Sequence, residues 1–141
     1  CASSASSSSK SVLVSQYELA MVAYKEGRFS DAEPLLRKLL DKYPQFSEGW
    51  YRLGNLYVRS GQYEAALTAF KTCLQYDANN AKAWYNLSLV HVKMSVSILD
   101  EGISKLQPGS DEYIQLNRLR SAMLTTTANL TKEISKDAGE K

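Results

Sequence analysis

The chain is short of the residues that most catalytic and metal sites need. It has one histidine, His91, and two cysteines in 141 residues. His91 lies inside a helical pattern, with no cysteine or carboxylate at metal-ligand spacing, so neither a zinc site nor a general base is expected there. The sequence also lacks a phosphate-binding glycine loop and the G-x-S-x-G and H-E-x-x-H signatures. We therefore predict a protein that is not an enzyme and that has no catalytic or metal-binding residue, no cofactor and no small-molecule substrate.

An excess of one charge and long hydrophobic runs are also missing. Lysine and arginine number 17 and the acids 15, a net charge of +2, which gives no broad field to hold nucleic acid or a membrane surface. No run of about 18 apolar residues occurs, so no membrane-spanning helix is expected. Hydrophobic residues make up 44% of the chain, enough for one compact domain.

A repeat with a fixed offset organises what is present. A step of 34 residues carries Tyr51 back to Tyr17 and forward to Tyr85, and it carries Gly61 back to Gly27. Leucine, tryptophan and alanine positions follow the same step. Because so many residues stay in phase, the chain is predicted to be built from copies of one unit.

The central copy, residues 47–80, has the clearest pattern. It reproduces the spacing W-x2-L-G-x2-Y…A-x3-F through these residues: Trp50, Leu53, Gly54, Tyr57, Ala66 and Phe70. This pattern resembles the tetratricopeptide repeat (TPR). The resemblance implies an all-α, right-handed solenoid of helical hairpins, with two full repeats, a degenerate third repeat and a long C-terminal helical hairpin as a cap.

Local signals give the expected elements. Glycine and proline positions and helical spacing of apolar residues predict helices over these ranges: 11–26, 30–43, 47–60, 63–76, 81–106 and 111–135. The helix over 81–106 is expected to be continuous, because Ser95 replaces the turn glycine; a break near Ser95 is the alternative. A bulky residue at Gly54 should overpack the hairpin by roughly 1 to 3 kcal/mol, and Cys73 is expected to be a buried free thiol.

The domain prediction follows from these elements. A serine-rich, flexible tether occupies 1–11, the solenoid domain 12–136 and a disordered tail 137–141. Within the solenoid we expect the following parts: repeats 13–46 and 47–80, the degenerate repeat 81–106 and the capping helix 111–135.

The first residues suggest a membrane link. Cys1, Ala2 and the serine-rich tract that follows resemble the mature N-terminus of a bacterial lipoprotein. The resemblance implies an acylated Cys1 and, with alanine second, an outer-membrane protein that faces the periplasm. The alternatives are an unmodified cysteine and a cytoplasmic protein.

A partner-binding groove is implied by the repeat family. Its first helices line the concave side of the solenoid, and the positions that face this groove include the following residues: Tyr17, Met21, Tyr24, Tyr51, Asn55, Arg59, Lys82, Tyr85 and Leu89. Tyrosines with polar neighbours suit an extended or helical peptide. The alternatives are that these tyrosines pack between repeats, or that the chain's own last helix fills the groove.

These observations predict a lipid-anchored scaffold or adaptor of the cell envelope. It would bind a protein partner in a larger complex and would bind no nucleic acid. The layout resembles pilotins and pilus-assembly lipoproteins, which implies a pilus or secretin-type secretion apparatus. The alternative is a soluble cytoplasmic TPR co-factor that binds a peptide or helix in its concave groove.

Overall fold

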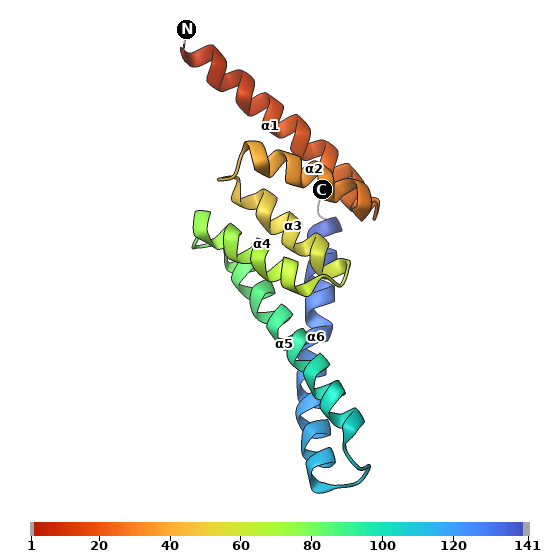
Figure 1. Ribbon diagram of the computed structural model, residues 1–141. Coiled ribbons are helices and arrows are strands. Elements are labelled where there is room, and N and C mark those ends of the chain that lie inside the picture. Colours follow the sequence, from red (N-terminus) through yellow and green to blue (C-terminus); the bar gives the residue numbers. More distant parts are fainter. Residues whose placement is uncertain (1, 140–141) are drawn as a thin grey trace. The chain divides into compact units, whose positions relative to one another are not determined.

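The computed structural model describes the backbone of residues 2–139 and the side chains of residues 7–125 and 128. Within this range the chain forms helices only, as the sequence predicts. The six helices are α1 (Ala2–Lys25), α2 (Phe29–Lys42), α3 (Ser47–Arg59), α4 (Tyr63–Tyr76), α5 (Ala81–Lys105) and α6 (Asp111–Gly139) (Figure 1). The fold is an all-α solenoid of helical hairpins.

The helices divide into two compact units, where the sequence suggests a single domain. The first unit extends to Ala83 and holds α1 to α4, and the second begins at Trp84 and holds most of α5 and all of α6. In the first unit, α1 packs against α2, α2 against α3 and α3 against α4. The two full repeats therefore form one stack of two hairpins.

The turns of these hairpins have the same geometry. Gly27 and Gly61 both have φ of 74°, a left-handed conformation that only glycine adopts without strain. The N–H of Arg28 donates to the carbonyl of Ala23 at 2.9 Å, and the N–H of Gln62 to that of Tyr57 at 2.8 Å. Both bonds satisfy carbonyls at a helix C-terminus, so the sequence repeat is also a repeat of backbone geometry.

A close helix approach fixes the second hairpin. A methyl group at Gly54 would lie 2.5 to 2.9 Å from three ring carbons of Phe70, a residue that is fully buried. Gly49 is similar, because a methyl group there would lie 2.8 Å from Leu40 on α2. Glycine is needed at both positions so that α3 can approach α4 and α2. Cys73 is a buried free cysteine, as the sequence predicts.

The second unit is a long antiparallel hairpin. Helix α5 runs unbroken through Ser95, whose hydroxyl donates to the carbonyl of His91 at 2.9 Å. Gly109, with φ of 87°, turns the chain, and the hydroxyl of Ser110 accepts the N–H of Tyr113 at 3.2 Å. An ion pair between Arg120 and Asp100 joins the two helices.

Helices α1 and α6 are longer than the sequence predicts, and α2 begins one residue earlier. Helix α1 begins at Ala2, so the serine tract continues the helix instead of forming a tether. Ser11 and Ser15 donate their hydroxyls to carbonyls one turn earlier, at 2.8 and 2.9 Å, which is compatible with a helix. Helix α2 begins at Phe29, one residue before the predicted start, and has no side-chain cap. Helix α6 reaches Gly139, so residues 137–139 are helical and not a disordered tail.

Candidate functional site

The predicted tyrosine groove contains both buried and accessible residues. The buried ones are the following: Met21, Tyr24, Tyr51, Asn55 and Leu89. The remaining ones are the half-buried Tyr17 and the exposed Arg59, Lys82 and Tyr85. A ligand cannot touch the five buried side chains in this structure. Partner binding stays a prediction for the four accessible residues of the groove.

Packing within the first unit explains the burial of two tyrosines. The ring of Tyr51 lies 6.1 Å from that of Phe70, centroid to centroid. The ring of Tyr24 lies 5.8 Å from that of Phe29, and the guanidinium of Arg59 is 5.5 Å from the centroid of Tyr24. Both tyrosines are therefore core residues of the first unit, whereas the resemblance to the repeat family implies that they face the groove.

Tyr17 instead joins the two repeats through a polar cluster. Its hydroxyl donates to Glu48 Oε1 at 3.3 Å and accepts from Arg52 Nε at 3.2 Å, while Arg52 also donates to Glu48 at 2.7 Å. Burial is the main cause that raises the pKa of Tyr17, against the opposing charge of Arg52. The cluster links α1 to α3 and leaves Tyr17 little freedom to contact a partner.

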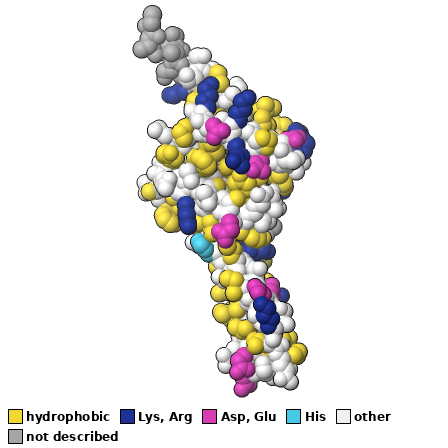
Figure 2. Space-filling view, in the orientation of Figure 1, with side chains coloured by type: hydrophobic (Ala, Val, Ile, Leu, Met, Phe, Trp, Pro, Cys, Tyr) yellow, Lys and Arg dark blue, Asp and Glu magenta, His cyan; other side chains and the backbone are white. Residues whose placement is uncertain are grey.

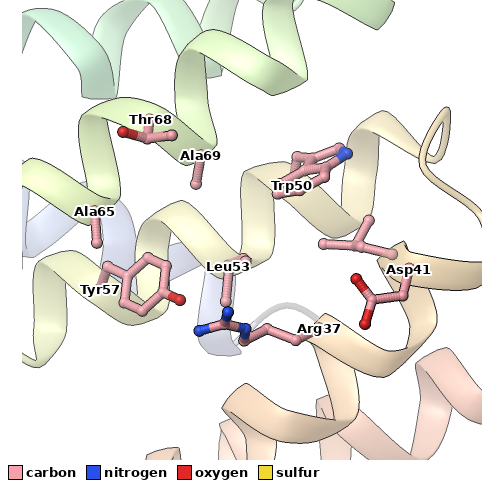
Figure 3. Close-up of a pocket in the computed structure, with 9 residues that line it drawn as sticks. Arg37, Asp41, Trp50, Leu53, Tyr57, Ala65, Thr68 and Ala69 are labelled. Carbon is pink, nitrogen blue, oxygen red and sulfur yellow. The ribbon is translucent and has the colours of Figure 1, made fainter.

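A pocket on the first unit was not anticipated from the sequence. It has a volume of about 270 Å³ and opens between α2, α3 and α4 (Figure 3). Its walls are mostly apolar, and its lining consists of the following residues: Arg37, Leu40, Asp41, Trp50, Leu53, Tyr57, Ala65, Thr68 and Ala69. All nine come from the α1–α4 unit.

Hydrogen bonds hold the aromatic walls of this pocket in place. The indole Nε1 of Trp50 donates to the carbonyl of Pro44 at 2.8 Å, which fixes the ring against the connection before α3. The hydroxyl of Tyr57 donates to Glu33 Oε1 at 2.9 Å. Burial, then the hydrogen bond to Glu33, raises the pKa of Tyr57. The two rings are therefore fixed before any ligand arrives.

Two opposite charges border the pocket. Arg37 pairs with Glu33 at 3.5 Å, and the Arg37 side chain is 64% exposed. Within the part of the chain that the structure describes, Asp41 has no ion-pair or hydrogen-bond partner. In Figure 3 its carboxylate points toward the side of the pocket that Leu53 and Arg37 line. Asp41 is thus available to a positively charged group bound at the pocket.

The sequence contains only part of the signal for this pocket. Trp50, Leu53 and Tyr57 recur at helical spacing and are predicted to share a face of α3. The pocket exists because Ala65 and Ala69 on α4 are too small to fill the space in front of that face. Helix faces can be assigned from periodicity, but the unfilled volume between three helices requires their positions in space.

Other surface features of the described residues define a chemical site less clearly. Among the described residues there is no group of three or more histidine, cysteine or acidic side chains that could hold a metal ion. None of the described helices is long and apolar enough to cross a membrane. The face shown in Figure 2 mixes lysine, arginine, aspartate and glutamate with hydrophobic side chains. The α2–α3–α4 pocket is therefore the best-defined candidate site.

Comparison with known proteins supports the repeat. Residues 23–87 match the tetratricopeptide repeat family model, a range that runs from the end of α1 into α5. The human protein O-mannosyl-transferase TMTC3 (Homo sapiens) is 26% identical over 113 residues, which cover 80% of this chain and 12% of the relative. The mouse protein of the same name (Mus musculus) is 28% identical over 74 residues, 52% of this chain and 8% of the relative. The chain thus spans a small part of these curated relatives. A tetratricopeptide domain is a scaffold for protein–protein interaction, and this is the function class that the match supports.

Proposed function

We propose that this chain is a non-enzymatic scaffold that captures a segment of another protein through the α2–α3–α4 pocket and so supports assembly of a larger complex. The observation that carries the proposal is the pocket itself, with fixed aromatic walls and a charged border. It lies within the range that matches the protein-binding repeat family.

The size of the pocket favours a protein side chain as its ligand. Sites for small molecules usually measure about 300 to 1,000 Å³ and enclose most of the ligand. A pocket of about 270 Å³ falls below that range. It suits one large apolar side chain presented by a partner, in the manner of an interface anchor that fills a pocket.

The charge of Asp41 indicates a second feature of the ligand. Asp41 faces the pocket without an ion pair among the described residues. A lysine or arginine next to the apolar anchor would form a charge-assisted hydrogen bond with this exposed carboxylate. The preferred ligand is therefore an extended or helical segment with a large apolar residue and a neighbouring basic residue.

Crosslinked pulldowns with matched variants test this proposal. Thr68→Arg places a long side chain at the pocket, whereas Thr72→Arg changes the same residue type on the same helix outside the lining. Both threonines donate their hydroxyls to the carbonyl four residues earlier, at 3.2 and 2.9 Å. The partner captured by the wild type should be lost with Thr68→Arg and kept with Thr72→Arg. Equal capture by both variants would rule out the pocket as the binding site.

The absence of enzymatic activity is part of the same proposal. The matched relatives are named as transferases, but the aligned segment is only 12% of the human protein. The segment here consists of helical hairpins without a metal-ligand cluster among the described residues. We expect no mannosyl transfer by the purified chain, and measurable transfer would refute a pure scaffold.

A finer proposal concerns location. It holds that lipid on Cys1 anchors the scaffold at the outer membrane, facing the periplasm, within a pilus or secretin-type secretion apparatus. It rests on the lipoprotein-like tract at Cys1 and Ala2, and Cys1 lies outside the described residues. Intact-mass analysis of protein from its native membrane should find three acyl chains on Cys1. An unmodified thiol or additional upstream residues would favour the alternative, a cytoplasmic co-factor that binds a peptide or helix in its concave groove.

A further inference from the structure

One face of α1 is apolar and exposed where its counterparts elsewhere in the chain are buried. The residues are Leu19, 58% exposed, and Val22, 50% exposed. Ser15, one turn earlier, is exposed too. Spacings of four and three residues place all three on one stripe of the helix. We define Ser15, Leu19 and Val22 as the α1 stripe.

The repeat offset identifies the counterpart of this stripe on α3. Adding 34 to each position gives Gly49, Leu53 and Leu56. Leu53 is 3% exposed and Leu56 is 1% exposed, and Gly49 is buried as well. On α5 the same step leads to Ala83, Leu87 and Val90, which are also buried. Of these three equivalent stripes, the one on α1 is exposed.

What covers the stripe on α3 is known from the structure. Helix α2 packs against α3, and a methyl group at Gly49 would lie 2.8 Å from the side chain of Leu40. Leu40 and Leu53 also line the same pocket. Leu36, four residues before Leu40 on α2, is fully buried. The cover at Gly49 is therefore Leu40 of an amphipathic helix, which carries a second buried leucine, Leu36, one turn earlier.

From this internal equivalence we propose that the α1 stripe is a docking surface for an amphipathic helix of a second polypeptide, one that presents leucine-class side chains at i and i+4 as α2 does. The docked helix repeats on α1 the contact that α2 makes on α3. Ser15 replaces Gly49 but is still small, so a close approach at that turn is retained. The surface lies on α1, whereas the α2–α3–α4 pocket does not include any residue of α1.

A second copy of this chain is a poorer occupant. The leucines of its own α2 that would serve as the cover, Leu36 and Leu40, are 0% and 2% exposed. They cannot leave their own hairpins without exposing the core.

The test uses a helix-stapled, fluorescent peptide with the sequence of residues 29–42, titrated onto the full chain. Saturable binding is expected, and Val22→Glu should weaken it by about tenfold or more, since a buried charge replaces an apolar contact. The matched control is Val14→Glu on the same helix: Val14 is 53% exposed and lies off the stripe. Its counterpart in the second repeat is already Glu48, so this variant should bind the peptide like the wild type.

Circular dichroism should show the same helicity for both variants, because both valines are exposed. A peptide with Leu36 and Leu40 replaced by aspartate should not bind. No binding of the wild-type peptide, or equal weakening by Val14→Glu and Val22→Glu, would overturn the proposal. Concentration-dependent dimerisation that Val22→Glu abolishes, without peptide binding, would also overturn it in favour of a second copy. The pocket proposal is unaffected by any of these results, since Thr68→Arg tests it separately.

Discussion

The α3–α4 hairpin and the α5–α6 hairpin are built on different principles. The first brings two helices into close contact at Gly54, where an added methyl group would lie 2.5 Å from the ring of Phe70. In the second, an added methyl group at Gly102 would lie 3.5 Å from Leu116, an ordinary contact. Large apolar side chains of the long hairpin remain exposed, such as Ile98 at 70%. A glycine inside a helix therefore marks a close approach only when a rigid, buried partner faces it.

The largest expected effect is on the stability of the α3–α4 hairpin. Phe70→Ala removes a fully buried ring and should lower the free energy of unfolding by about 3–5 kcal/mol. Leu116→Ala, in the looser hairpin, should cost clearly less because Leu116 is only half-buried. Urea unfolding followed by circular dichroism measures both. Equal losses would mean that the two hairpins are packed alike.

A smaller loss is expected from crowding the same contact. Gly54→Ala places a methyl group against the ring of Phe70 and should cost about 1–3 kcal/mol by overpacking, reduced by the better helix propensity of alanine. The expected readout is a lower urea midpoint with an unchanged slope. A stability equal to or above that of the wild type would show that the ring of Phe70 moves aside freely.

High pH should weaken the first unit. Burial, aided by the charge of Asp77, raises the pKa of Cys73 from 9.0 to about 11. The thiol therefore stays protonated in the folded state while the unfolded state ionises, so this contribution to stability is present below pH 9 and is lost as the pH rises to about 11. Halfway between these two pKa values, the free energy of unfolding should be lower by about 1 kcal/mol. Cys73→Ala should show a shallower fall over the same range, and an identical pH dependence would contradict the assignment.

The smallest expected effect has the opposite sign. Gly102→Ala meets only an ordinary contact with Leu116, so the gain in helix propensity should dominate and stabilise α5 by about 0.5–1 kcal/mol. Thermal unfolding of Gly102→Ala beside Gly54→Ala makes the comparison direct. Destabilisation of both to the same degree would erase the distinction between the hairpins.

Much of the fold could be predicted because the signals are local and repeated. The glycines at positions 27 and 61 mark turns with the same φ, and the uninterrupted run through Ser95 predicts one long helix, which the structure has. The serine tract was the main error in secondary structure. Small polar residues are weak helix formers, and the sequence does not show that a packed helix just after the tract extends into it.

Less of the candidate site could be predicted. The 34-residue step identifies equivalent positions but not their neighbours, so Tyr51 and Tyr24 were expected at a surface, whereas packing against Phe70 and Phe29 buries them. The pocket depends on alanines of α4 facing Trp50 across a gap. Such a gap is a property of three helices together, and no single stretch of sequence encodes it.

The chain has two tryptophans, and they allow a direct test of the pocket as the protein-binding site. Trp50 lines the pocket, whereas Trp84 lies outside it and is 53% exposed. NMR spectra of the full chain, with the indole signals assigned through Trp84→Phe, should be recorded with and without the captured partner segment. We predict that the Trp50 ring signals shift and that those of Trp84 do not. An unchanged Trp50 signal at saturating partner would contradict the account.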